Sequence, residues 1–214
     1  YLGECDSVLG FNTKQGNSSI RFHGGWLILH HGKKFIEEYP EYSTLFYKLY
    51  ISRELDDWFL DICKKEDTLV PEELANIELV KEIKIQNKVS PSYEIFIDLK
   101  DIIGNEGFII SQQVIIKVSK IIPVYIMDLS YRISHRLLCD NKLDLNGSAE
   151  TLEIMKIEKL VREFFAKNNF KELSYLYDYY DTVFEWKDVP DLEPFNRRFT
   201  LGDAVFVDNL DICK

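Results

Sequence analysis

Hydrophobic and polar residues alternate most clearly between residues 92 and 133. Tyr93, Ile95 and Ile97 are separated by single residues that would face the other way, which is the period of a β-strand. Residues 104–107, with the sequence Gly-Asn-Glu-Gly, are typical of a hairpin turn, and a long stretch rich in β-branched residues follows them. Because the connection is short, we expect antiparallel strands over about 92–133.

A second alternating stretch lies near the start of the chain. Ile20 and Phe22 alternate with Arg21 and His23, and a pair of glycines follows directly. This pattern is typical of a half-buried strand that runs into a turn or bulge. The sequence therefore predicts a β-hairpin region over residues 1–36.

Two segments instead carry apolar residues at helical spacing. The first covers about 41–64 and follows Pro40, a residue that favours the first turn of a helix. The second covers about 150–167, with Ser148 as the expected N-cap and Asn168-Asn169 as the expected C-terminal stop. The apolar positions that define the two stripes are Leu45, Phe46, Leu49, Leu55, Trp58, Phe59 and Ile62, and then Leu152, Ile157, Leu160, Val161, Phe164 and Phe165.

These elements predict an α+β fold, in which a mainly antiparallel sheet is covered by the two longer helices. Each apolar helix stripe needs a sheet face or another helix to cover it. The 214 residues suit a single domain over 1–214. The segment 171–214, which alternates aromatic and acidic residues, gives no clear secondary structure.

The charge balance narrows the class of partner. The chain has 36 acidic and 26 basic residues and a formal net charge of −10. Nucleic acids and anionic membranes favour proteins of the opposite sign, so we expect neither as a partner. A basic protein surface is the natural complement of an acidic one.

Cysteine usage and hydropathy bear on the compartment. The four cysteines lie far apart and form no CxxC pair, whereas a disulfide framework would be denser for this length. The longest apolar run is interrupted by Pro123 and Asp128, well short of a membrane helix. We therefore expect a cytoplasmic protein with reduced thiols and without a cofactor.

The histidines raise the question of a metal site. His23, His30 and His31 lie within one short stretch, but adjacent residues of a strand point to opposite faces. His30 and His31 therefore do not converge easily on one ion, and a third ligand is not evident. A hairpin that carries exposed or hydrogen-bonded imidazoles is the preferred interpretation over a zinc site.

Residues 142–153 imitate a calcium-binding loop. The oxygen-bearing residues, with one glycine, fall at the loop's third, fifth, sixth, ninth and twelfth places, and they are Asp144, Asn146, Gly147, Glu150 and Glu153. The first place, where an anionic ligand is needed, holds Lys142, whose ammonium group repels a cation. We therefore expect a turn that leads into a capped helix, and no metal site.

Catalytic signatures are missing from the sequence. It contains no GxSxG, SxxK, HExxH or phosphate-binding glycine motif. A rival hypothesis is an enzyme acting on a small polar substrate. Such an enzyme would use either His135 with Arg132 or Arg136, or the His23 and His30 pair, as acid–base groups.

The C-terminal segment 171–214 is the strongest candidate for a binding surface. It holds ten acidic and five basic residues, with six tyrosine, phenylalanine and tryptophan residues interleaved between 175 and 186. Aromatic anchors surrounded by carboxylates suit an interface with a basic protein. We expect the partner-binding residues to be Asp178, Tyr180, Asp181, Glu185 and Trp186. The alternative is that the rings belong to the core and that the acids only keep the surface soluble.

A family resemblance also indicates a protein that binds another protein. The stretch "VSKIIPVYIMDLSYRI" and the tail "DVPDLEPFNRRFTLGDAVFVDN" resemble bacterial immunity proteins of polymorphic-toxin and contact-dependent inhibition systems. In the tail, Val189-Pro190-Asp191 and residues 200–208 carry the likeness. The resemblance implies an acidic, cytosolic, non-enzymatic protein that blocks a cognate toxin, such as a basic nuclease. A phage or mobile-element accessory protein remains an alternative.

Overall fold

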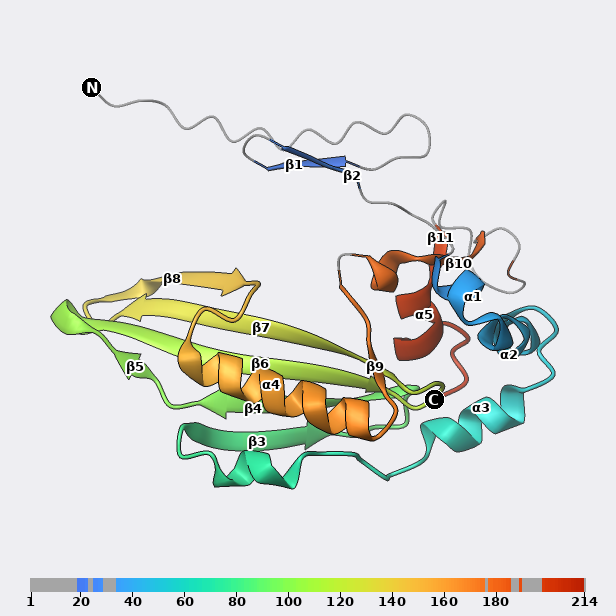
Figure 1. Ribbon diagram of the computed structural model, residues 1–214, viewed down its shortest axis with the longest axis horizontal. Coiled ribbons are helices and arrows are strands. Elements are labelled where there is room, and N and C mark those ends of the chain that lie inside the picture. The colour runs from blue at the N-terminus through green and yellow to red at the C-terminus, as the bar shows by residue number, and fades with distance from the viewer. Residues whose placement is uncertain are drawn as a thin grey trace.

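The largest element of the protein is a seven-stranded sheet, seen in a computed structural model (Figure 1). The structure describes the backbone of β1 (Ser19–Phe22) and β2 (Gly25–Ile28), and residues 34–175, 177–185, 189 and 198–213. β1 and β2 pair antiparallel. The three clustered histidines, His23, His30 and His31, lie outside the described residues.

The seven strands form an antiparallel meander with two short additions. The order is β3-β4-β6-β7-β8; β5 pairs with β6, and β9 pairs parallel with β7. The α+β class predicted from the sequence is thereby confirmed. The strands are β3 (Val80–Gln86), β4 (Ser92–Leu99), β5 (Ile102–Ile103), β6 (Phe108–Ser119), β7 (Val124–His135), β8 (Leu138–Asn146) and β9 (Lys171–Glu172).

Helix α4 (Leu152–Lys167) covers one face of this sheet (Figure 1). Its buried residues meet the alternate strand residues that the period-2 pattern assigns to one face. Burying each such aliphatic or aromatic side chain contributes roughly 1.5–3 kcal/mol. The contacting sets are Ile154, Ile157, Val161 and Phe165 of α4, and Tyr93, Ile95, Ile97, Val114, Ile116, Val118, Tyr125, Leu129 and Tyr131 of the sheet.

The start of α4 differs from the expectation. The N-cap is Thr151, whose side chain accepts a hydrogen bond from Ile154 N, and not Ser148. Ser148 is still held by the sheet, because its carbonyl accepts a hydrogen bond of 2.9 Å from the Tyr131 hydroxyl. The C-terminal stop is where the sequence places it, since Asn169 adopts the left-handed conformation with φ 62°.

The predicted helix over 41–64 is two helices, α2 (Pro40–Tyr50) and α3 (Asp56–Cys63). Between them Arg53 has a φ of 58°, a conformation that ends a right-handed helix. The Arg53 guanidinium donates two hydrogen bonds of 2.9 Å to Asp56 in the first turn of α3. A further short helix, α1 (Lys34–Glu38), begins inside the region that was expected to be β-hairpin.

α2 and α3 do not cover the sheet face, contrary to the prediction. They form a second core beyond one end of the sheet, with α5 (Leu201–Phe206), β10 (Thr182–Glu185) and β11 (Arg198–Thr200) (Figure 1). At its centre the fully buried Tyr50 donates a hydrogen bond of 2.6 Å to Ala204 O. The Tyr50 ring lies 4.7 Å from that of Phe199.

The tail residues 200–208 form part of this second core. Thr200 and Asp203 form a capping box at the start of α5. Ala204 and Phe206 are buried, and the Asp208 carboxylate accepts hydrogen bonds from the backbone N–H groups of residues 212 and 213. Pro190 and Asp191 lie outside the described residues.

Candidate partner-binding surface

Four of the predicted binding residues lie in or beside two short elements: Asp178 and Tyr180 belong to the 3-10 helix η3 (Asp178–Tyr180), Asp181 follows it, and Glu185 ends strand β10. Asp178 closes the turn before η3, because its Oδ2 accepts a hydrogen bond of 2.8 Å from Ser174 N. This is the ordinary local use of an aspartate at a turn. The structure therefore gives the Asp178 carboxylate a structural role.

Asp181 is more deeply buried than Asp178. It is only 5% exposed, and its Oδ2 accepts a hydrogen bond of 2.8 Å from Phe35 N at the start of α1. Burial raises the pKa of this carboxyl above its usual value, and the Phe35 hydrogen bond acts in the opposite direction. Asp181 thus joins two segments that lie 146 positions apart.

Tyr180 belongs to a cluster of three tyrosine rings. The ring centroids of Tyr175, Tyr179 and Tyr180 lie 5.1–5.7 Å apart. The hydroxyl of Tyr180 donates a hydrogen bond of 3.3 Å to that of Tyr175. This contact, followed by burial, raises the pKa of Tyr180 to about 12. The phenol is therefore neutral at physiological pH.

Tyr179 connects the tyrosine cluster to α5. The Tyr179 ring stacks on Phe206 and lies directly over Gly202. A Cβ atom at Gly202 would overlap this ring, so only glycine allows the approach. This packing places the tyrosine cluster against the second core.

Two strongly exposed rings of the segment were not among the expected binding residues. Tyr175 and Tyr177 are 53% and 55% exposed. The side chain of Glu185 and all of Trp186 lie outside the described residues. The sequence could not separate these exposed rings from buried ones, because aromatics and acids alternate throughout the segment. We define Tyr175, Tyr177 and Tyr180 as the tyrosine surface.

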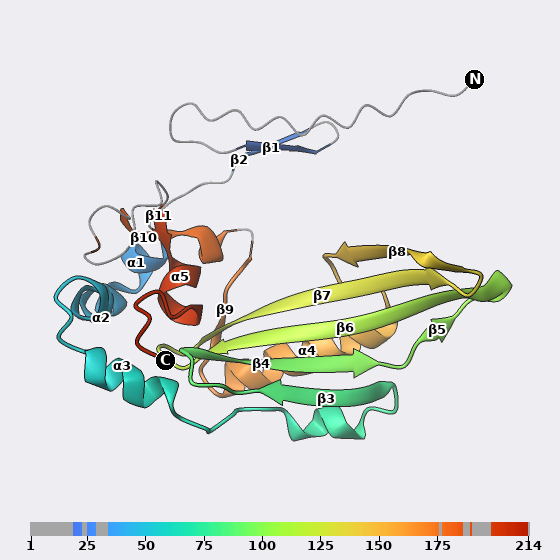
Figure 2. The same ribbon diagram turned by 180° about the vertical axis from the view of Figure 1, so that it is seen from behind.

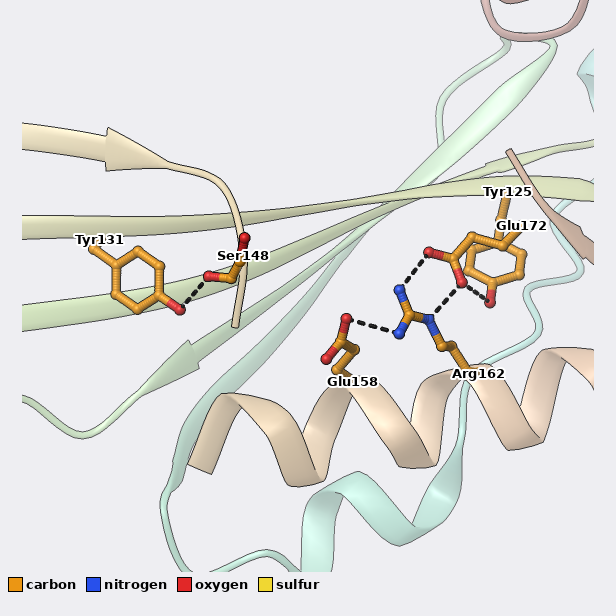
Figure 3. Close-up of polar contacts among 6 residues, drawn as sticks. All are labelled: Tyr125, Tyr131, Ser148, Glu158, Arg162 and Glu172. Atoms are coloured by element: carbon orange, nitrogen blue, oxygen red, sulfur yellow. Dashed lines mark hydrogen bonds and ion pairs between the residues drawn. The ribbon is translucent and has the colours of Figure 1, made fainter. Parts of the chain in front are cut away.

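A polar cluster holds α4 to the sheet (Figure 3). Arg162 of α4 donates hydrogen bonds of 2.7 and 3.1 Å to Glu172 of β9 and lies 2.9 Å from Glu158. The Tyr125 hydroxyl donates to the same Glu172 carboxylate at 3.2 Å. Burial, and then this carboxylate, raises the pKa of Tyr125 well above its usual value. These groups satisfy one another's hydrogen-bonding capacity and thereby connect α4 to β7 and β9.

The rival catalytic and metal hypotheses gain no support from the described residues. Arg132 pairs with Asp144 at 2.7 Å, and the Nδ1 atom of His135 accepts a hydrogen bond from Leu137 N. Asp144 and Asn146 of the calcium-like stretch belong to strand β8. In the described part of the chain, no group of three or more histidine, cysteine, aspartate or glutamate residues is placed to hold a metal ion.

The thiols that the structure describes are Cys63 and Cys213, and both are free. Burial raises the pKa of each thiol, so both are protonated at neutral pH. Cys5 and the side chain of Cys139 lie outside the described residues.

A comparison with protein families, curated proteins and solved structures found no match to this chain. None of the helices in the described ranges combines the length and the apolar character that a bilayer crossing requires.

Proposed function

We propose that this chain is a non-enzymatic, acidic binding protein, an immunity protein that neutralises a cognate bacterial toxin with a basic surface in the cytoplasm. The observation that carries the proposal is the tyrosine surface. Tyr175 and Tyr177 expose more than half of their area, and Tyr175 packs against the partly buried rings of Tyr179 and Tyr180. Tyrosine is enriched among interface hot spots, because it offers a large contact area and a hydroxyl at low conformational cost.

The charge of the molecule supports the same class of partner. A net charge of −10 accelerates encounter with a basic protein and disfavours nucleic acid. Asp178 and Asp181 also accept backbone hydrogen bonds, so we assign this attraction to the summed field of all the acidic residues and not to a direct contact of these two. The tyrosine rings would then supply the buried contact after encounter.

The test is rescue of bacterial growth from the toxin domain encoded beside this chain's gene. The parent chain should restore growth, and the double variant Tyr175→Ala/Tyr177→Ala should lose rescue and bind the toxin at least about tenfold more weakly. Tyr47→Ala is a matched control, because Tyr47 on α2 has the same 53% exposure as Tyr175. It should rescue like the parent.

Thermal melts of each variant separate binding from folding. The proposal is contradicted if no toxin gene accompanies the chain. It is also contradicted if the folded double variant and Tyr47→Ala rescue equally well.

A further inference from the structure

Strand β8 forms an edge of the sheet, and within the described residues it pairs with β7 alone. Gly147 N donates a hydrogen bond of 3.0 Å to Leu129 O. In an antiparallel pair, hydrogen-bonded and non-bonded positions alternate. The register therefore directs the backbone N–H and C=O groups of Asn146 away from β7. The outward side of an edge strand is a template for another strand.

One face of this edge is apolar. Leu143 and Leu145 are 55% and 45% exposed and point to the same face as the residues under α4. Leu143 ends a row of paired side chains that continues through Ile133 and Ile110 to Ile102. The row is partly open to solvent, with Ile102 38% exposed. An added strand with apolar side chains on this face would extend the row.

The opposite face is polar and hollowed into a groove of about 560 Å³. Figure 2 shows this face of the sheet, over which no described helix lies. The floor consists of two cross-strand rows of polar side chains, one from β4 to β8 and the other from β6 to β8. They are Asp98, Gln113, Ser130 and Asn146, and then Ser111, Arg132 and Asp144.

Four carboxylates line the groove, those of Asp98, Asp101, Asp128 and Asp144, against the two cations Lys81 and Arg132, so its charge favours cations. Arg132 is neutralised by Asp144 at 2.7 Å, and Gln113 is held by Asp98 at 2.6 Å. Asp101 and Asp128 also line the groove, are exposed, and form no ion pair with any described residue. Lysine or arginine side chains placed over this face would therefore meet unpaired carboxylates.

We propose that the β8 edge binds an extended segment of a protein partner in which apolar residues alternate with lysine or arginine. The added strand would place its apolar side chains beside Leu143 and Leu145 and its cations over the groove. This is the β-augmentation mode, in which backbone hydrogen bonds give affinity and alternate side chains give specificity. Only the identity of the partner, the basic toxin, rests on the proposed function.

The other edge of the sheet lacks these features. β3 carries exposed Lys81, Glu82 and Lys84, and the short 3-10 helix η1 (Glu72–Asn76) lies beside it (Figure 1). The Lys84 ammonium lies 2.8 Å from Glu82. Charged side chains and covering segments are the usual means of blocking strand addition. Among the strands that the structure describes, β8 is therefore the edge left open.

The probe is a fluorescein-labelled octapeptide of alternating valine and lysine, with binding followed by anisotropy at low salt. It should bind saturably. The same peptide with N-methyl groups on alternate amides keeps its charge but cannot pair as a strand, and should bind at least about tenfold more weakly. A valine–glutamate peptide should not bind.

Protein variants locate the site. Asn146→Pro removes a backbone donor that β7 does not use, a position where edge strands tolerate proline, and should weaken binding about tenfold. Asn146→Ala keeps that donor and should bind like the parent. Asp128→Asn should weaken binding several-fold, whereas Glu73→Gln on η1, an equal charge change, should not.

Equal binding of the N-methylated peptide would overturn the proposal, since it would show a purely electrostatic contact. Equal binding by a folded Asn146→Pro variant would also overturn it; if that variant unfolds, the N-methyl comparison on the parent protein still decides. None of these assays uses the toxin. Loss of peptide binding with intact toxin rescue would refute the edge site alone, and the reverse would refute the immunity function alone.

Discussion

Asp181 illustrates how a single residue combines stability with pH dependence. Its carboxyl pKa in the folded protein is raised above 3.8 by burial, although Phe35 N donates to it. In the interval between the unfolded and folded pKa values the folded state binds more protons. The free energy of unfolding therefore falls as pH rises through that interval.

The variant Asp181→Asn should remove this pH dependence. The amide oxygen still accepts the Phe35 hydrogen bond but does not titrate. The melting temperature of the variant minus that of the parent should therefore increase as pH rises from below 3.8 to neutral. A constant difference across that range would contradict the assignment. Asp181→Ala is the comparison variant. It does not titrate either, so its difference from the parent should shift with pH in the same direction. It leaves the Phe35 N–H unpaired, so it should be about 1–3 kcal/mol less stable than Asp181→Asn at each pH.

The acids of the C-terminal segment were the least predictable residues. Asp178 and Asp181 were expected to face a partner because they stand between aromatic residues. Each instead accepts a backbone N–H, at Ser174 and Phe35 respectively. The Ser174 contact is local and has a sequence signal, an aspartate in a turn. The Phe35 contact spans 146 positions, and only the tertiary fold creates it.

At the scale of elements, the capping box of α5 is the feature that the second core depends on. Thr200 Oγ1 accepts from Asp203 N at 3.2 Å, while the Asp203 carboxylate accepts from Thr200 N at 3.0 Å. α5 has six residues, all of them buried. A helix this short forms mainly through its cap and its tertiary contacts.

Thr200→Ala should therefore destabilise the protein by about 0.5–2 kcal/mol in denaturant unfolding, because one cap acceptor is lost. Thr200→Ser keeps the oxygen and should retain most of the stability. Equal unfolding midpoints for the parent and Thr200→Ala would show that the cap contributes nothing.

Regular elements were predictable, and their interruptions were not. The meander β4–β6–β7 and helix α4 follow from side-chain period alone, since each has one buried face. The break between α2 and α3 is marked in the sequence only by loose apolar spacing at Ser52-Arg53, which does not by itself end a helix. The left-handed Arg53 and its pairing with Asp56 fix that break. The packing of α2 and α3 on α5 joins segments more than 130 positions apart, for which a single sequence carries no signal.

At the scale of the whole molecule, two cores are joined at one end of the sheet. Ser92 Oγ of β4 donates to Phe206 O of α5 at 3.0 Å. Lys120 Nζ donates to Cys63 O and Lys65 O at 2.8 and 2.9 Å. The sheet core carries the β8 edge, and the second core carries the tyrosine surface. One acidic molecule therefore presents two separate candidate contacts for a basic partner.

The most direct test of the immunity function is the kinetics of binding between this chain and the neighbouring toxin domain over a series of salt concentrations. The account predicts a specific complex whose association rate falls about tenfold or more between low and high salt. Tyr175→Ala/Tyr177→Ala should chiefly raise the dissociation rate, because it removes contact area and not charge. Absence of a complex, or a complex whose rates respond neither to salt nor to loss of the two tyrosines, would contradict the account.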